Sequence, residues 1–378
     1  MQRRTFLGAT AAAVALGAAE MPSTAAAAEP TPLIHQTDLF RPHGDPDDHF
    51  DLAAVYGLAL RGAVDLRGIL CDFPPPRRQG DPDTVAVAML NHLTGLAVPL
   101  VVGMPQRPTD RRDDQAKAAP CDLTGVNWLL RTLRESPRPV AISMVGSCKD
   151  VAVASRREPE LFAAKCRAIY LNSGTGAPDL PLNSRREFNV ELNPGSYSAI
   201  WDIPCPIYWL PCYDHLDHGQ PDPRVVQRYA SYFQFPMSQI LPELAPTMQR
   251  YFLSMLEQEL TTHWIKSLRT PVDPAKLTTW GTRARNMWGT ATFLHLAGLT
   301  VNAKGELVPE NQPGVYRFLP VTVTCTDDGH TQWREGTGTP ARFKFEIADM
   351  ANYQSAMTKA LLALIKPLGQ DYVATPGQ

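Results

Sequence analysis

Short hydrophobic runs alternate with amphipathic segments along the first 213 residues of the chain. Runs typical of buried β-strands are expected at 32–38, 64–73, 98–104, 139–146, 166–174 and 205–213. Between them, hydrophobic positions recur with helical spacing at 48–62, 81–95, 121–136, 149–164 and 193–202. Because alternating strands and helices are joined by right-handed crossovers, the pattern predicts an α/β fold of the Rossmann type, a mostly parallel sheet flanked by helices.

After residue 213 the alternation gives way to a stretch that is expected to be mostly helical. Helical spacing is found over 224–233, 245–268 and 285–299. Strands return at 317–327 and 341–349, and a final helix is expected at 352–368. We therefore predict one large domain over residues 32–370 with a helical excursion, and not two independent domains.

The first 28 residues have the composition of an export signal. Arg3 and Arg4 precede an alanine-rich apolar stretch and then small residues suited to cleavage near 26–28. The apolar stretch is too short and too rich in alanine to span a bilayer comfortably. Residues 1–28 are therefore expected to form a twin-arginine-type signal peptide, which implies a periplasmic or secreted protein without stable membrane insertion.

Composition excludes several classes of function. The chain has 378 residues, of which 20% are charged, and its formal net charge is -2. Because the chain has no excess of positive charge, we expect no nucleic-acid partner. Its seven cysteines lack zinc-ligand spacing. Neither a nucleophile elbow nor a glycine-rich phosphate loop occurs in the sequence. The sequence leaves open whether the chain forms a homo-oligomer.

The stretch TDLFRPHGDPDDHFDLA, residues 37–53, crowds acidic residues around the end of the first expected strand. It contains five aspartates, which are Asp38, Asp45, Asp47, Asp48 and Asp51. Carboxylates this close repel one another unless a cation lies among them, and a hard cation such as Ca²⁺ prefers oxygen ligands. One aspartate could instead cap the following helix, but a single cap does not explain the cluster. We therefore predict a cation site at the carboxyl end of the sheet, where open parallel sheets bind ligands.

Three segments together resemble the nucleoside hydrolases, a family of inosine- or uridine-preferring N-ribohydrolases that hold one calcium ion. The first is the strand, TD, DPDD and helix arrangement just described; the others are VGSCKDVAVASRREPELFAAKCRAIYLNSG at 145–174 and REFNVELNP at 186–194. The resemblance covers essentially the whole mature chain. It implies a nucleoside hydrolase-like fold and a calcium-dependent hydrolase of N-glycosidic bonds, acting on a small-molecule nucleoside or glycoside.

Position by position, the resemblance implies a set of oxygen ligands for calcium. Asp38 matches the general base, which also ligates the metal, and Asp47 and Asp48 match the calcium-binding pair, with Asp47 also contacting substrate. The backbone carbonyl of Lys149 falls where the family supplies a carbonyl ligand. The first turn is longer than in the family, so Asp45 is an extra carboxylate that could replace Asp38 or Asp47 as a ligand.

A second set matches the residues that bind the ribose hydroxyls. Asn183, Glu187 and Asn189 are implied in this role by the resemblance. From the residues alone, Glu187 could equally form a surface salt bridge with Arg185 or Arg186. The two asparagines could equally make loop hydrogen bonds, which are common for this residue type.

The chain departs from the family where a late histidine–aspartate pair should begin a helix near residue 287. Met287 and Trp288 stand there, and neither can ligate calcium; Asp214 at another strand end could compensate. The glycine–asparagine after the second strand is also missing, and Asp72 is the nearest polar substitute. Two alternatives follow: a catalytically altered relative that binds a sugar or cell-wall glycan, and a hydrolase of a related ribosyl substrate whose pocket is reshaped by Trp288 and the loop 39–46.

Overall fold

The computed structural model describes residues 29–41, 47–75, 80–180, 184–216, 226–259 and 263–370. The expected signal segment 1–28 and the candidate residues Asp45 and Asn183 lie outside the described residues. Predictions for those positions therefore stay predictions.

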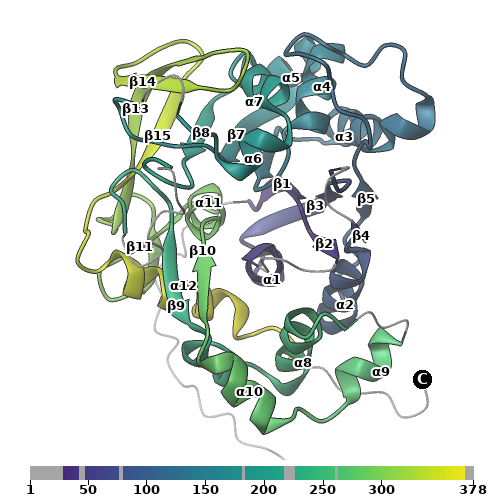
Figure 1. Cartoon of the computed structure of the whole chain (residues 1–378), viewed down its shortest axis with the longest axis vertical. Helices are drawn as coiled ribbons and strands as arrows, with labels where there is room; N and C mark the ends of the chain where they lie inside the picture. Colours follow the sequence, from purple (N-terminus) through teal and green to yellow (C-terminus); the bar gives the residue numbers. More distant parts are fainter. Residues whose placement is uncertain are drawn as a thin grey trace, which may run out of the picture.

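A nine-stranded sheet forms the centre of the molecule, in the order β14-β13-β15-β8-β7-β6-β1-β3-β5 (Figure 1). Seven of these strands run parallel: β5 (Leu100–Val102), β3 (Val64–Cys71), β1 (Thr31–Thr37), β6 (Val140–Met144), β7 (Cys166–Asn172), β8 (Ile207–Leu210) and β15 (Arg342–Ile347). The edge strands β13 (Tyr316–Cys325) and β14 (Thr331–Glu335) are antiparallel. The predicted mostly parallel α/β sheet is confirmed, and the polar ends of β1, β3, β6 and β7 meet at one edge.

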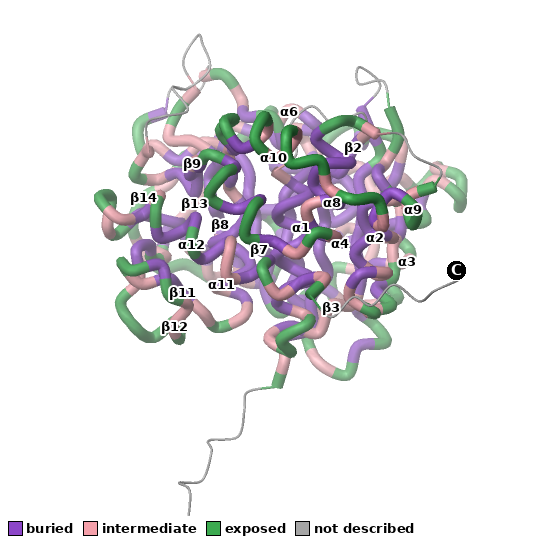
Figure 2. Tube along the Cα trace, turned by 90° about the horizontal axis from the view of Figure 1, so that it is seen from below, coloured by how far each residue is buried: buried purple, intermediate pink, exposed green. Residues whose placement is uncertain are grey.

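Helices cover both faces of the sheet and enclose two hydrophobic cores (Figures 1 and 2). One face carries α1 (Asp47–Leu60), α2 (Thr84–Thr94), α8 (Pro246–Leu256), α11 (Thr290–Leu296) and α12 (Tyr353–Ile365). The other carries α3 (Thr124–Glu135), α4 (Lys149–Arg157), α5 (Pro159–Lys165) and α7 (Pro194–Ile200). Successive residues of β1 serve opposite cores, Leu33 in the first and Ile34 in the second, as side-chain alternation along a strand requires.

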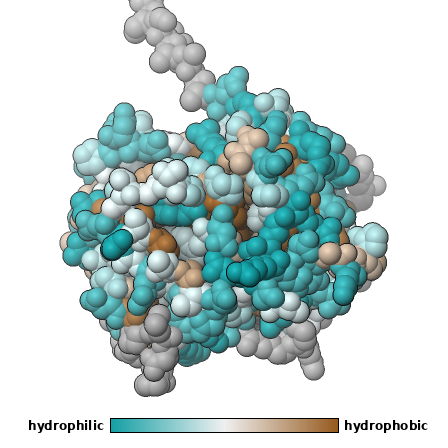
Figure 3. Space-filling view, turned by 90° about the horizontal axis from the view of Figure 1, so that it is seen from above, coloured by the Kyte–Doolittle hydropathy of each residue, from teal (hydrophilic) through white to brown (hydrophobic). Residues whose placement is uncertain are grey.

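The surface is largely hydrophilic. Figure 3 shows only small hydrophobic areas on the face seen from above. The large exposed hydrophobic side chains are scattered along the chain: Leu60, Phe73, Phe188, Ile265 and Met350. Among the described residues, no helix combines the length and the apolar character that a membrane crossing requires.

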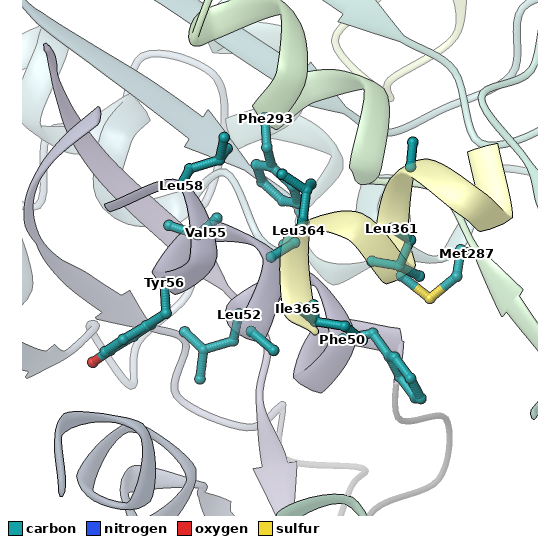
Figure 4. Packing of buried hydrophobic residues seen from close by; sticks show 14 of the residues in the cluster. Phe50, Leu52, Val55, Tyr56, Leu58, Met287, Phe293, Leu361, Leu364 and Ile365 are labelled. Carbon is teal, nitrogen blue, oxygen red and sulfur yellow. The ribbon is translucent and has the colours of Figure 1, made fainter. Parts of the chain in front are cut away.

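Helix α1 is held rigidly against the rest of the first core. Its apolar side chains meet those of α12 (Figure 4). Phe50 also stacks on Phe252, with ring centroids 4.1 Å apart. A methyl group at Gly57 would overlap the carbonyl of Leu364, so glycine allows the two helices to approach closely. This packing fixes the first turn of α1, which carries Asp47 and Asp48, beside the end of β1.

The helical excursion is less helical than its sequence predicts. The expected helix at 224–233 is wrong, because its described part is a loop that leads into the strand β9 (Phe233–Pro236). Phe233 and Phe235 are buried while Gln234 between them is half-buried, which is the period-two pattern of a strand. The expected helix at 285–299 begins instead with β10 (Ala284–Met287), which pairs antiparallel with β9, and only then continues as α11.

Proline and capping residues account for two smaller corrections. The expected helix at 149–164 is two helices, α4 and α5, because Pro159 starts a new helix rather than continuing the first. The expected Asp-Pro start of the second helix is displaced: Asp81 and Pro82 form the short strand β4 (Asp81–Pro82), and Asp83 caps α2 by accepting from Ala86 N at 3.2 Å.

Strand β15 buries a lysine completely. Lys344 is 0% exposed, and its Nζ lies 4.0 Å from the centroid of the Tyr229 ring and 4.3 Å from that of Trp333. Nζ donates to the carbonyl of Phe345 at 3.2 Å. Burial lowers the pKa of Lys344 to about 7, against the opposing effects of Asp214 and Glu346.

Lys344 should make stability depend on pH on the alkaline side. Its pKa is lowered in the folded protein, so between about pH 7 and 10 the unfolded chain binds the proton and the folded chain does not. The free energy of unfolding should therefore rise across this window, by an amount on the order of a few kcal/mol, in the wild type but not in Lys344→Met. Urea unfolding at a series of pH values measures this, with the exposed Lys304→Met as the control. Parallel curves for the wild type and Lys344→Met would contradict it.

Candidate active site

The end of β1 and the first turn of α1 are joined by their polar side chains. Asp38, the residue after β1, is 8% exposed. Thr37 Oγ1 donates to Asp48 Oδ1 at 2.9 Å, and a further side-chain hydrogen bond joins Asp38 to Asp48. Two carboxylates can lie within hydrogen-bonding distance only if they share a proton or a cation.

Mutual repulsion and burial raise the pKa values of the aspartates in α1. Burial, followed by the charges of Asp51 and Asp38, raises the pKa of Asp47. Burial, followed by the charges of Asp47 and Asp51, raises the pKa of Asp48. The pKa of Asp51 is raised by burial. The structure thus brings the predicted residues Asp38, Asp47 and Asp48 together, and adds Asp51 to them.

Asp72 adds another carboxylate from the neighbouring strand end. It directly follows β3, and its Oδ2 accepts from Ser147 N at 2.5 Å while its buried Oδ1 has no hydrogen-bond partner. A methyl group on Gly146 would lie 2.8 Å from both Asp38 Cβ and Asp72 Oδ2, so glycine is required where β6 ends. Burial raises the pKa of Asp72, and Lys149 opposes this increase. The polar substitute predicted from the sequence therefore adjoins the cluster.

Lys149 lies behind the cluster and not in it. Its Nζ is buried and donates to the carbonyl of Met104 at 3.0 Å. Asp150 accepts from Met104 N at 3.0 Å, and burial raises its pKa to about 6 although Lys149 lowers it. The Lys149 carbonyl belongs to the first turn of α4, where the helical hydrogen bond uses one of its two lone pairs. Its role as a metal ligand stays a prediction.

Glu187 faces the interior at the end of β7. It is 4% exposed and accepts from Gly174 N at 2.9 Å and from Asn189 N at 2.9 Å. The alternative of a surface salt bridge is wrong for Arg186, since that arginine pairs with Glu191 at 2.7 Å. Burial raises the pKa of Glu187, and its backbone hydrogen bonds partly offset the increase.

Asn189 is fixed by two backbone carbonyls. Its Nδ2 donates to Val145 O at 3.0 Å and to Asn172 O at 3.1 Å. Both amide protons are thus committed, and the amide oxygen is the atom that Asn189 can offer to a ligand hydroxyl. The expected loop hydrogen bonds of Asn189 are therefore present, and its role in binding a sugar hydroxyl stays a prediction.

Glu187 and the aspartate cluster both lie near the buried thiol of Cys212. After burial, the charges of Glu187, Asp47 and Asp38 all raise the pKa of the buried Cys212 thiol. Cys212 follows β8, which neighbours β7 in the sheet. We call two groups of residues the acidic walls of the site: the end of β1 with the start of α1, and Glu187 with the end of β7.

Three aromatic rings adjoin these walls. Trp288 is half-buried; its ring centroid lies 5.8 Å from that of Tyr213 and 5.6 Å from that of Tyr232. Its Nε1 is buried and has no hydrogen-bond partner. Burial raises the pKa of Tyr213, and the charges of Glu187 and Asp47 contribute, which places this ring next to the acidic walls. By contrast, Trp209 is completely buried in the second core, as expected for a packing residue.

The structure corrects the expected substitute for the missing late carboxylate. Asp214 is held by a loop instead: its Oδ1 accepts from Tyr229 N at 2.7 Å. Burial raises the pKa of Asp214, and the Tyr229 hydrogen bond and the charge of Lys344 partly offset the increase. Asp51 lies in the cluster instead. The sequence signal was present, because Asp51 follows Asp47 by four residues and Asp48 by three, and such positions share one face of a helix.

The donor set fits a hard cation. Among the described residues, no three side chains of the His, Cys, Asp and Glu types stand ready in a metal-binding arrangement. However, Oδ1 of Asp51 and Oδ1 of Asp72 are buried without a hydrogen-bond partner, and carboxylates that repel one another close in only when a cation offsets their charge. All the groups concerned are oxygen donors, as Ca²⁺ requires.

Comparison with known proteins places the chain near the nucleoside hydrolases. No protein-family model matches it. It is 29% identical over 89 residues to the pyrimidine-specific ribonucleoside hydrolase RihA of Salmonella arizonae, a match that covers 24% of this chain and 28% of that protein. The chain thus matches only about a quarter of that relative's length. The resemblance predicted from the sequence, to a nucleoside hydrolase-like family, is confirmed.

Solved structures extend the likeness of the fold to nearly the whole chain. The effector protein XOO4466 superimposes with a TM-score of 0.57 at 15% identity, over 90% of this chain and 94% of that one. The type III effector protein XopQ, solved with adenosine diphosphate ribose, gives a TM-score of 0.54 at 15% identity over 90% and 95% of the two chains. At this level of identity the likeness concerns the fold alone.

Replacing Gly146 by alanine should disturb the cluster. The added methyl group would push Asp38 and Asp72 apart, at a cost of about 1–3 kcal/mol in the free energy of unfolding. Calcium binding, measured by calorimetry, should weaken with it. Gly281→Ala is the control, because a methyl group there comes no closer than 3.3 Å to another atom. Unchanged calcium affinity and stability in Gly146→Ala would show that the two carboxylates tolerate displacement.

Proposed function

We propose that this chain is an exported, calcium-dependent hydrolase of N-glycosidic bonds that acts on a small nucleoside-like substrate. One observation carries the proposal: the carboxylates of Asp38, Asp47 and Asp48 crowd together at the carboxyl end of β1. Glu187 lies near them, since its charge acts on the same Cys212 thiol as the charges of Asp47 and Asp38. The match to a ribonucleoside hydrolase supports the reaction class.

An acidic pocket suits this reaction because of the charge that develops during bond cleavage. Breaking an N-glycosidic bond gives the sugar ring oxocarbenium character, which is positive. Fixed negative groups aimed at that charge stabilise the transition state in a site of low dielectric constant. Burial raises the pKa values of Asp47 and Asp48, and the charges of neighbouring aspartates raise them further. An added positive charge would relieve that repulsion.

The chain's own residues divide the work between the two walls. Asp38 accepts the proton of the attacking water, as its place at the strand end and its low exposure allow. Calcium, when bound, would be held by Asp47 and Asp48 together with Asp38, and would orient the sugar diol and the water. On the opposite wall, Glu187 and the amide oxygen of Asn189 accept hydrogen bonds from sugar hydroxyls.

The aromatic rings supply the place for the leaving group. Trp288, Tyr213 and Tyr232 adjoin the acidic walls and offer flat faces to a planar base. The unpartnered Nε1 of Trp288 is a donor available to an acceptor on that base. Export is proposed from the twin-arginine-type segment at residues 1–28, and cleavage of nucleosides outside the cytoplasm is compatible with that location.

A second function is favoured by the loss of the late histidine–aspartate pair. With Trp288 at that place, the chain could be a catalytically altered relative that binds a sugar-containing ligand without cleaving it. The structural neighbour XopQ was solved with adenosine diphosphate ribose, which makes that compound a suitable probe here.

Asp38→Asn should abolish hydrolysis while leaving the fold intact. Loss of a general base typically lowers the rate by about 10²–10⁴-fold. Release of ribose from inosine, uridine and adenosine should therefore fall by at least about 100-fold.

The wild type should lose activity when calcium is chelated and regain it when calcium is returned. Asp65→Asn is the control, since Asp65 pairs with Arg67 at 2.7 Å at the opposite end of β3. A wild-type protein that releases ribose from none of the three substrates would count against hydrolysis.

Trp288→Ala separates the two functions. Stacking on one aromatic ring is worth about 1–3 kcal/mol, so the variant should bind inosine and adenosine diphosphate ribose roughly tenfold more weakly by calorimetry. Binding by the wild type without any ribose release would select the altered relative. Unchanged binding in Trp288→Ala would remove the tryptophan from the ligand pocket.

A further inference from the structure

We infer that Asp51 of α1 is a ligand of the cation site and supplies, from this helix, the carboxylate that the start of α11 lacks. The inference rests on the proposed function and names a residue that neither the resemblance nor the comparisons assign.

The first argument is position. Asp51 lies one helical turn after Asp47, so the two carboxylates and that of Asp48 are neighbours on α1. The influence of Asp51 on the pKa values of both Asp47 and Asp48 is consistent with this proximity. α1 itself is locked in place by α12, so Asp51 cannot move out of the cluster without disturbing the first core.

The second argument is the unpartnered oxygen. Asp51 is 1% exposed, and its Oδ1 has no hydrogen-bond partner in the described structure. A buried carboxylate oxygen without a proton donor costs free energy unless something positive reaches it. Oδ1 of Asp72 is buried and unpartnered in the same way. A cation bound next to Asp51 would satisfy the free oxygen of that residue.

The third argument is the matching gap at the start of α11. Gly289 precedes this helix, and its N–H donates to the Asp51 carboxylate. A methyl group on Gly289 would overlap Asp51 Oδ2, so Asp51 fills the space that a side chain at position 289 would need. Met287, two residues earlier, is fully buried in the first core and belongs to the packing around α12 (Figure 4).

A purely structural role explains only one of the two carboxylate oxygens of Asp51. A carboxylate that accepts the N–H of Gly289 supports the start of α11, and one oxygen is enough for that. The second oxygen then gains nothing from its burial beside two other aspartates. A cation ligand uses both oxygens, one toward Gly289 and one toward the metal.

Calcium binding by Asp51→Asn tests the inference. Asparagine keeps an oxygen for Gly289 and nearly the same volume but removes the charge. Isothermal titration with calcium chloride should show affinity reduced by about tenfold or more. Thermal unfolding should show the calcium-free variant at least as stable as the calcium-free wild type, because one repulsive charge is gone, together with a smaller stabilisation by calcium. A purely structural role predicts unchanged calcium affinity and an unchanged stabilisation by calcium, because asparagine preserves the hydrogen bond from Gly289.

Two further variants complete the test. Asp273→Asn is the matched control, since Asp273 accepts from Ala275 N at 2.9 Å at the start of another helix outside the cluster; its calcium affinity should equal that of the wild type. The double variant Asp51→Ala with Gly289→Asp moves the carboxylate to the start of α11 and should recover calcium binding relative to Asp51→Ala alone. If Asp51→Asn does not fold, the double variant decides: recovered binding supports the inference, and no recovery overturns it.

The outcomes separate this inference from the proposed function. A wild type that binds calcium, with unchanged affinity in Asp51→Asn, overturns the role of Asp51 and leaves the hydrolase proposal standing. A wild type that binds no calcium overturns both the role of Asp51 and the calcium dependence of the proposed function. Hydrolysis with weakened calcium binding in Asp51→Asn supports both.

Discussion

Repulsion among buried carboxylates is the constraint on which the functional end of this molecule depends. Asp38, Asp47, Asp48 and Asp51 are held within one short region where a strand ends and a helix begins. Removing charged groups from water costs several kcal/mol each unless opposite charge compensates them. The free energy that keeps these groups together must therefore come from other interactions. The packing of α1 between the sheet and α12 supplies it.

The same packing explains why the cluster is rigid enough to be specific. The β1–α1 connection itself lies partly outside the described residues, but both of its ends are fixed: β1 is paired on both sides by β3 and β6, and α1 is almost wholly buried. Glycines at the surrounding contacts remove the side chains that would block close approach. Gly57 allows close approach of α12, and Gly146 allows close approach of Asp38 and Asp72. Gly289 does the same for Asp51.

Much of this arrangement could be predicted from the sequence because it follows from local periodicity. Alternating strands and helices fix the parallel sheet, and the strand ends then bring Asp38 and Glu187 to one edge. What failed was of two kinds. The strands β9 and β10 have only four residues each, too few for their period to outweigh the helical pattern around them. Asp214 also follows a strand, but proximity to a strand end does not determine where a side chain points. Its carboxylate accepts a hydrogen bond from Tyr229 N and lies near the charge of Lys344.

The proposed role of Asp51 would let the site change its ligands without losing its charge. Its helical spacing from Asp47 is visible in the sequence, but its meaning depends on Gly289, which is distant in sequence and carries no side chain to read. When the carboxylate comes from α1, Gly289 before α11 must be small, because Asp51 occupies the space of a side chain there. The neighbouring Trp288 then does not have to bind the metal. Trp288 then turns to Tyr213 and Tyr232 and joins an aromatic surface beside the acidic walls. If Asp51 is the ligand, the missing late pair and the added tryptophan have one explanation: α1 would supply the negative charge, and Trp288 would be free to contact the leaving group proposed above.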